Sequence, residues 1–179
     1  DKWTPAPRND DQQVKVLFLG ADFDRKGGDI VHDIALSGDL PNVSWHFVTR
    51  ATGKSTGRIA FHNGLQPDSH DLIETVRSCH LLVLPTRADC YSFATIEANC
   101  CGLPAIITDV GGISDIVQDG VNGTLLPSAD RELVSVAIRR YLDDPGLIAC
   151  QGARARELAV ERFEASKHAD ALAGILASA

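Results

Sequence analysis

The stretch LLVLPTRADCYSFATIEANCCGLPAIITD, residues 81–109, decides the fold class. It begins with one apolar run, LLVLP, and ends with another, PAIITD. Both runs are continuous rather than alternating, which is typical of strands buried on both faces of a parallel sheet. Between them, residues 93–101 have helical character, and Gly102 and Pro104 stop the helix. A buried strand, a helix and a second buried strand indicate a parallel α/β unit.

The same alternation continues on both sides of this stretch. Further strands are predicted at 14–20, 43–49, 58–64 and 123–127, and helices at 27–39, 68–80 and over most of 130–179. Repeated alternation of this kind predicts an α/β fold, a doubly wound, Rossmann-like parallel sheet with a helical C-terminal segment. Residues 1–13 are polar and contain proline, so we assign them to a linker or edge segment and residues 14–179 to one domain.

Composition limits the classes of partner and compartment. The chain has 179 residues, enough for one domain with a sizeable core. Its net charge of −7 gives no general electrostatic case for nucleic acid or an anionic membrane. No apolar run is long enough to span a bilayer, and no signal-peptide pattern opens the chain. The five cysteines are odd in number and show no framework spacing, so we expect a cytoplasmic protein, or one at the inner face of a membrane within a longer chain.

The loop GADFDRKGGD, residues 20–29, is a candidate anion site. It joins a strand to a helix and carries Arg25 and Lys26 directly before two glycines. Helix N-termini bind anions through free N–H groups, glycine permits close approach, and the two cations add charge. The alternative is a solvated basic turn without a ligand.

The stretch ITDVGGISDIV repeats this pattern of a strand, a Gly-Gly pair and a short helix. Gly111 and Gly112 either contact a ligand or form a structural turn.

The stretch ATGKSTG is not a P-loop, because Val48 stands where the motif requires glycine and a predicted strand follows. No GxGxxG motif is present, and Cys79, His80 and Cys90 match no standard zinc spacing.

Residues 87–127 resemble the donor-binding region of the retaining glycosyltransferases of the GT-B fold. That family carries a pair of glutamates around a Phe-Gly pair, then Glu-Ala, Gly-x-Pro, a strand, Gly-Gly and a Gly-x-x-Gly turn. The matching residues here are, in order, Asp89, Tyr91-Ser92, Glu97-Ala98, Gly102-Leu103-Pro104, Gly111-Gly112 and Gly120-Val121-Asn122-Gly123. The resemblance extends to the loop DFDRKGG and to the closing helices, and so covers nearly the whole chain from Val14.

The resemblance implies roles for the two acids and the two cations. Glu97 is expected to accept hydrogen bonds from the ribose hydroxyls of a nucleotide sugar, as an acceptor-only carboxylate can. Asp89 is expected beside the transferred sugar, near the anomeric carbon. Arg25 and Lys26 are expected to hold the diphosphate and stabilise its charge as it leaves. Because these cations take the place of the metal ion used by other transferases, no metal or other cofactor is expected.

The resemblance also implies backbone contacts with the donor. The N–H groups of Ser92, Phe93 and Ala94 would face sugar or phosphate oxygens at a helix N-terminus. Gly111 and Gly112 would let the backbone approach the donor sugar. The edge of the nucleobase would meet the three residues Asn63, Gly64 and Leu65.

Three departures from the family pattern bear on these roles. Asp89 replaces the usual glutamate and is one methylene shorter. Ser92 replaces glycine, which is tolerated if its backbone dihedrals are ordinary. Ala21 stands where the family carries an arginine five residues before Lys26, and Arg25 is adjacent to Lys26 instead.

The family has two Rossmann-like domains, and this chain matches the second. We therefore expect a nucleotide-sugar-binding domain whose partner is a missing N-terminal, acceptor-binding domain, and which binds nucleotide but does not turn over alone. Two alternatives stay open. One is a non-catalytic nucleotide-binding module of the same fold, and the other is an unrelated doubly wound protein such as a nucleotide-sugar epimerase or a flavodoxin-like module.

Overall fold

The computed structural model describes residues 2–7 and 13–163. Six parallel strands form one sheet in the order β3-β2-β1-β4-β5-β6. The strands are β1 (Val14–Leu19), β2 (Val43–Val48), β3 (Ile59–His62), β4 (Leu81–Leu84), β5 (Ala105–Thr108) and β6 (Gly123–Leu126). The helices are α1 (Gly28–Ser37), α2 (His70–Arg77), α3 (Phe93–Cys100), α4 (Arg131–Asp143) and α5 (Pro145–Phe163), with a 3₁₀ turn η1 (Ile113–Asp115). The doubly wound α/β prediction is confirmed.

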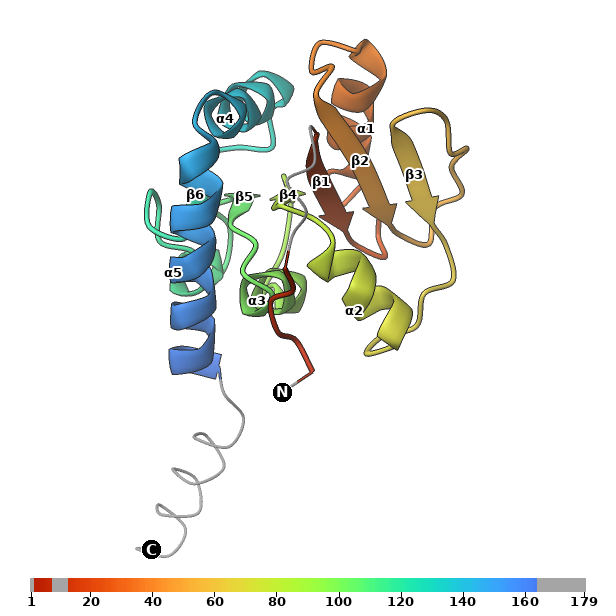
Figure 1. The fold of residues 1–179 in the computed structure, drawn as a ribbon. Coiled ribbons are helices and arrows are strands. Elements are labelled where there is room, and N and C mark those ends of the chain that lie inside the picture. Colours follow the sequence, from red (N-terminus) through yellow and green to blue (C-terminus); the bar gives the residue numbers. More distant parts are fainter. Residues whose placement is uncertain (1, 8–12, 164–179) are drawn as a thin grey trace, which may run out of the picture.

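Helices cover both faces of the sheet. In Figure 1, α1 and α4 lie over one face, α2 and α3 lie over the other, and α5 runs from α4 past β6 to α3. The approach of α5 to α3 is close, since a Cβ atom at Gly152 would lie 2.4 Å from the carbonyl oxygen of Gly102. The predicted helical segment is thus confirmed to Phe163, apart from a break at Asp144, and its remainder, 164–179, lies outside the described residues.

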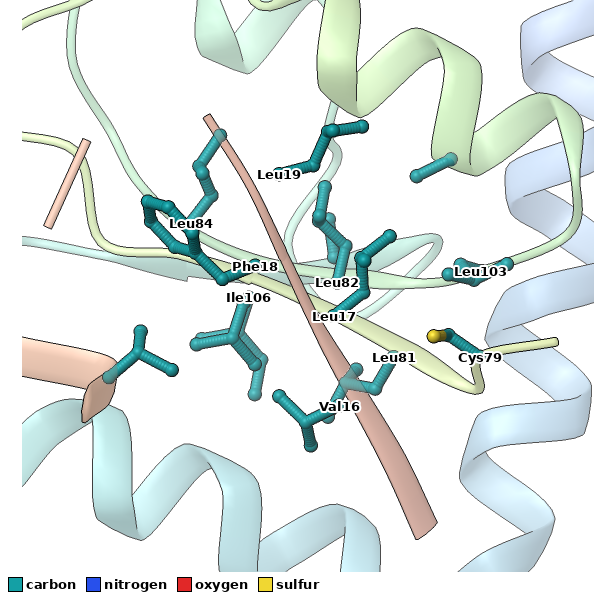
Figure 2. Close-up of a cluster of buried hydrophobic side chains, with 14 of the residues drawn as sticks. Val16, Leu17, Phe18, Leu19, Cys79, Leu81, Leu82, Leu84, Leu103 and Ile106 are labelled. Atoms are coloured by element: carbon teal, nitrogen blue, oxygen red, sulfur yellow. The ribbon is translucent and has the colours of Figure 1, made fainter. Parts of the chain in front are cut away.

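The core follows from the apolar runs. β1 and β4 pair at the centre of the sheet, and all four residues of β4 are buried. Figure 2 shows side chains of both strands, including Leu17, Phe18 and Leu82, packed in one cluster. Because a parallel sheet buries both faces, the buried residues of such a strand must be apolar, and Lys15, the one polar residue of β1 and β4, is only partly buried. The continuous runs in the sequence meet this requirement.

Local residues set the helix starts. Ser69 caps α2, and its hydroxyl oxygen accepts the N–H of Leu72 at 3.2 Å. Asp68, directly before Ser69, lies in the left-handed region with φ 57°. Within the predicted linker, Trp3 packs against the core, and Arg156 donates to its carbonyl at 2.7 Å. Part of this segment therefore lies against the domain, while residues 1 and 8–12 are outside the described residues.

The strand order places a switch point between β1 and β4. From β1 the chain moves outward to β2 and β3, and then returns to β4 on the other side of β1. The connection after β1 therefore leads to one side of the sheet and the connection after β4 leads to the other side. Ligands of open α/β sheets bind in the crevice that such a divergence leaves.

Candidate donor-nucleotide site

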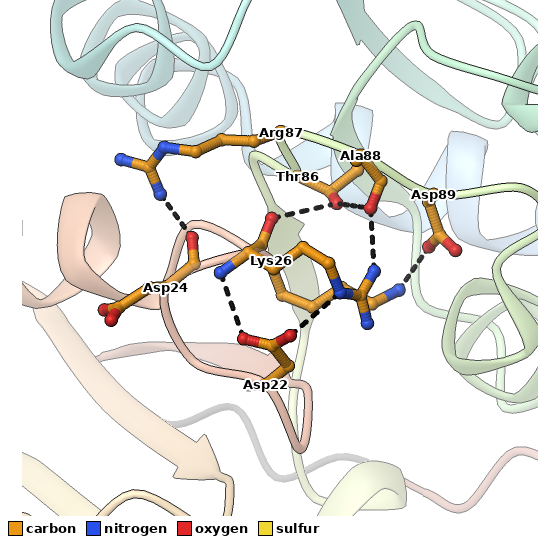
Figure 3. Close-up of polar contacts among 8 residues, drawn as sticks. Asp22, Asp24, Lys26, Thr86, Arg87, Ala88 and Asp89 are labelled. Atoms are coloured by element: carbon orange, nitrogen blue, oxygen red, sulfur yellow. Dashed lines mark hydrogen bonds and ion pairs between the residues drawn. The ribbon is translucent and has the colours of Figure 1, made fainter.

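The loops after β1 and β4 are joined to each other at the switch point. The N–H of Arg87 donates to the carbonyl of Arg25 at 2.9 Å. The Thr86 hydroxyl lies 3.3 Å from the same carbonyl (Figure 3). Gly27 has φ 77°, and a Cβ atom there would lie 2.1 Å from the carbonyl oxygen of Pro85. The first Gly-Gly pair is thus required for the fit of the two loops as well as for its backbone conformation.

The predicted catalytic side chains already have partners. Lys26 Nζ forms an ion pair with Asp89, and only 12% and 11% of the two side chains are exposed. Arg25 donates through Nε to Asp22 at 3.0 Å and through Nη1 to the Ala88 carbonyl at 2.7 Å (Figure 3). The backbone N–H of Arg25, followed by its side chain, lowers the pKa of the Asp22 carboxyl. Lys26, which is expected at the diphosphate, and Asp89, which is expected at the sugar, are therefore in contact.

A cavity of about 460 Å³ opens beside these loops, within the range of about 300–1,000 Å³ that small-molecule sites occupy. It lies at the carboxyl ends of β1, β2 and β3 and against α3. Its lining comprises Leu19, Gly20, Ala21, Arg25, Lys26, Val48, Thr49, Arg50, His62, Gly64, Leu65, Gln66, Pro67, Leu72, Ala94 and Glu97. Six of the predicted site residues, Arg25, Lys26, Gly64, Leu65, Ala94 and Glu97, thus share one cavity. Ala21, where the family carries arginine, lines it too.

Glu97 lies on the α3 wall of this cavity. Burial, and after it the negative charge of Asp68, raise the pKa of Glu97 to about 7. A carboxylate in such surroundings is costly to ionise unless hydrogen-bond donors are supplied to it. Ligand hydroxyl groups that donate to Glu97 would supply them and favour the charged form.

The start of α3 shows how Ser92 replaces glycine. Ser92 is the N-cap residue, with φ −94° and ψ 92°, so its backbone is extended and unstrained. Its side chain is buried, and its oxygen accepts the hydroxyl of Thr95 at 2.9 Å. The condition set by the sequence, ordinary dihedrals at Ser92, is met. Neither Ser92 nor Phe93 lines the cavity, and the Phe93 side chain is 73% exposed.

The second Gly-Gly pair packs against the loop after β4 from its other side. Gly111 has φ 59°, and a Cβ atom there would lie 2.1 Å from the carbonyl oxygen of Asp89. The N–H of Gly112 donates to the carbonyl of Cys90 at 2.9 Å. A second, shallower cavity of about 540 Å³ is lined by Arg25, Arg87, Ala88, Asp89, Cys90, Val110 and Gly111. Arg25 lines both cavities, whereas Asp89 and Gly111 line the second.

The far end of the first cavity contains residues that the sequence analysis missed. Val48, Thr49, Arg50 and His62 lie at the ends of β2 and β3, where the strand-end rule could have found them. The predicted Asn63 does not line the cavity. Its side-chain amide instead donates to the carbonyls of Thr49 at 3.0 Å and Ala51 at 2.7 Å, which holds the two loops together.

Three absences concern the described residues. In residues 2–7 and 13–163, no group of three or more His, Cys, Asp or Glu is placed to hold a metal ion. Metal independence nevertheless stays a prediction.

No helix within these same residues has both the length and the apolar character needed to cross a bilayer. Nor does a helix open after Lys54 in this part of the chain: β3 follows, in line with the rejection of a P-loop.

Sequence comparison gives the family. Residues 57–158, more than half of the chain, match the family Glycosyl transferases group 1. The chain belongs to this family. It is 35% identical over 109 residues to a D-inositol 3-phosphate glycosyltransferase from Streptomyces bingchenggensis, a match that covers 61% of this chain and 24% of the relative. The chain thus spans about a quarter of the length of that curated relative.

Solved structures share the fold. The Anabaena protein Alr3699/HepE, in complex with UDP-glucose, is 22% identical with a TM-score of 0.78, over 94% of this chain and 50% of that protein. The C-terminal domain of a glycosyl transferase group 1 family protein from Francisella tularensis is 16% identical with a TM-score of 0.77, over 91% of this chain and 96% of that domain. At these identities the likeness establishes the GT-B type of α/β fold.

Proposed function

We propose that this chain is the donor-binding half of a retaining glycosyltransferase. The reaction would move a hexosyl group from a nucleoside-diphosphate sugar to a sugar or a lipid-linked acceptor. The observation that carries the proposal is one cavity at the switch point with Lys26 and Arg25 on one side and the Glu97 carboxylate on the α3 wall. Family membership and the UDP-glucose complex of Alr3699/HepE support it.

The proposed roles follow the chemistry of each group. Glu97 accepts the ribose hydroxyls, and Lys26 and Arg25 stabilise the diphosphate as its bond to the anomeric carbon breaks. Asp89 lies beside the sugar and stabilises positive charge at that carbon. The acceptor oxygen forms the new glycosidic bond, and its proton passes to an oxygen of the departing diphosphate. Cations that are already in place make a metal ion unnecessary for the leaving group.

The Lys26–Asp89 ion pair gives this scheme a specific feature. Lys26 contacts Asp89 from the loop after β1, so one ammonium group joins the acid expected at the sugar to the loop expected at the diphosphate. Because an ammonium has three donors, Lys26 can keep Asp89 while it binds a phosphate oxygen. Donor binding would then order the acid and the leaving group together.

Calorimetric titration with UDP, GDP, ADP and CDP tests the binding half of the proposal. We expect one nucleotide to bind, and Glu97→Ala to weaken it about 10- to 100-fold, as loss of a charged acceptor does. Glu132→Ala, an exposed glutamate on α4 at the other face of the sheet, is the matched control and should bind as the wild type does. Equal affinity in the wild type and Glu97→Ala would contradict the ribose role.

The catalytic half of the proposal needs the acceptor-binding part of the protein. We expect the 179-residue chain to bind nucleotide without measurable sugar transfer, since the acceptor would contact a second domain. Sugar transfer by this chain alone would refute that statement. Absence of transfer after an N-terminal domain is restored would favour a non-catalytic nucleotide-binding module.

A further inference from the structure

The end of the cavity farthest from the phosphate loop is bounded by β2 and β3. β3 lies two strands from β1, about 10 Å across the sheet. Four polar side chains line this end: Thr49, Arg50, His62 and Gln66. Two of them serve their own loops, because the Thr49 hydroxyl oxygen accepts the N–H of Ala51 at 3.2 Å and Gln66 donates to the Gly64 carbonyl at 3.2 Å.

Of the other two side chains, Arg50 is exposed and His62 is held in place. The His62 ring stacks on His46 of β2, with ring centroids 5.3 Å apart and planes 12° apart. His62 Nε2 lies 3.1 Å from His46 Nδ1. Since β2 and β3 are parallel neighbours with Val48 opposite His62, the two histidines project from one face of the sheet.

This contact couples the tautomers of the two histidines, because one ring nitrogen must donate and the other must accept. Burial, then the charges of His62, Lys15 and His80, lower the pKa of His46 to about 4, and burial lowers the pKa of His62. Both rings are therefore neutral at pH 7, and a single proton lies between Nε2 and Nδ1. His62 Nδ1 has no hydrogen-bond partner among the described residues. Its role is the opposite of the role of Nε2: it accepts when Nε2 donates to His46, and it donates when Nε2 accepts.

We propose that His62 selects the nucleobase of the donor and that His46 is a positioning residue that fixes the His62 ring for this task. The proposal rests on the proposed function, since it places a base at the β3 end of the nucleotide cavity. Nucleobases differ in their edges: uracil and guanine carry carbonyl acceptors where cytosine and adenine carry amino donors. In a given tautomer a ring nitrogen either donates or accepts, so it pairs with one kind of edge and rejects the other, and the contact with His46 couples that choice to the neighbouring ring.

The test compares nucleotide affinities in variants of the 179-residue chain. Titrations use UDP, GDP, ADP and CDP, with inorganic pyrophosphate and ribose 5-phosphate as probes that lack a base. The variants are His62→Leu, which removes both ring nitrogens, His62→Asn, which keeps a polar atom near the Nδ1 position, and His46→Leu. The control is His32→Leu, whose ring touches Phe61 edge-on but does not line the cavity.

The expected result is a change in base preference with the rest of the site intact. His62→Leu should weaken the preferred nucleotide about tenfold and bring the four affinities closer together, with pyrophosphate binding unchanged. His62→Asn should keep part of the preference, and His46→Leu should reduce it less than His62→Leu does. His32→Leu should match the wild type, and thermal unfolding of each variant shows that it is folded.

Three results would overturn the proposal, and they are distinguishable. If the wild type binds a nucleotide and both His62 variants keep its ratios of affinity, His62 does not select the base, while the proposed function stands. If no nucleotide binds to the wild type, the nucleotide site itself is refuted together with the role of His62. An equal loss of pyrophosphate and nucleotide binding in His62→Leu would show a structural role and also count against base selection.

Discussion

Two Gly-Gly turns of this domain are alike in sequence and different in what surrounds them. Both turns follow a buried strand, and one glycine of each turn packs closely against the loop after β4. Gly27 lies against the Pro85 carbonyl, and Gly111 lies against the Asp89 carbonyl. The first turn brings Lys26 and Arg25 to the first, deeper cavity, whereas the second brings only Val110 and backbone to the shallower one. A Gly-Gly pair therefore indicates close backbone packing. The residues directly before the pair, Arg25 and Lys26 in one turn and Val110 in the other, decide whether the adjacent cavity carries positive charge.

The largest expected effect concerns the packing that the two turns share. Gly27→Ala and Gly111→Ala should each lower the free energy of unfolding by roughly 3–5 kcal/mol, because a left-handed φ and a contact of 2.1 Å both oppose the Cβ atom. Gly38→Ala is the control: Gly38 has φ 75° but nothing within 4 Å, so a loss of about 1–2 kcal/mol is expected. Urea unfolding measures all three, and equal losses would show that the contacts with the 85–89 loop are unimportant.

The charges that only the first turn carries should decide nucleotide affinity. Lys26→Ala should weaken the preferred nucleoside diphosphate about 10- to 100-fold, as the loss of a charged hydrogen bond does. Lys54→Ala, in the stretch that superficially resembles a P-loop, should leave the affinity unchanged, because Lys54 is exposed and outside the cavity lining. Titration calorimetry measures both, and a reversed order would move the phosphate site to residues 51–57.

Two titrating groups, Glu97 in the lining of the first cavity and His46 behind His62, should make stability depend on pH in opposite directions. Because the pKa of Glu97 is raised from 4.5 to about 7, its contribution is present below pH 4.5 and lost as pH rises to 7. Because the pKa of His46 is lowered from 6.5 to about 4, its contribution is present above pH 6.5 and lost as pH falls to 4. The two trends oppose each other between pH 4.5 and 6.5.

Single variants separate these trends. Between pH 4.5 and 6.5, Glu97→Gln should gain stability as pH rises and His46→Leu should lose it. The slopes should reach roughly 0.5–1 kcal/mol per pH unit, after allowance for partial exposure of both groups. Urea unfolding at several pH values measures them. Parallel profiles for the two variants would contradict the assignment of the titrating groups.

The smallest expected effect concerns Ser92, the N-cap residue of α3. Ser92→Gly should change stability by less than about 1 kcal/mol, because the backbone is already extended and only the contact with Thr95 is lost. The same variant restores the residue usual in the family, so nucleotide affinity should stay within about twofold of the wild type, a free-energy change below the about 1.4 kcal/mol of a tenfold effect. A large gain in affinity would show that the Ser92 side chain obstructs the site.

The fold could be predicted because the property that specifies it is local. Strands buried on both faces must be apolar throughout, so the runs at 81–85 and 104–109 mark β4 and β5 closely. Residues of the site that lie in one loop, such as Arg25 and Lys26, could be predicted for the same reason. The partners of these two side chains, among them Asp89 and the Ala88 carbonyl, could not be predicted in this way.

The rest depends on strand order, which apolar runs do not encode. The ion pair between Lys26 and Asp89 joins residues 63 positions apart, and it exists because β1 and β4 are neighbours. His62 reaches the cavity through the pairing of β2 and β3, and its contact with His46 has no pattern in sequence. The three residues 63–65 are predicted to contact the base through their backbone, and the sequence pattern does not reveal that the Asn63 amide also bridges the carbonyls of Thr49 and Ala51.

The central claim is that nucleotide binds in the cavity at the ends of β1, β2 and β3. Backbone amide NMR during titration with the nucleoside diphosphate that binds tests it most directly. The account predicts chemical-shift changes concentrated at residues 20–28, 62–67 and 93–97, with small changes along α4 and at Gly38. Changes centred on the shallower cavity at 110–112, with none at 62–67, would contradict it.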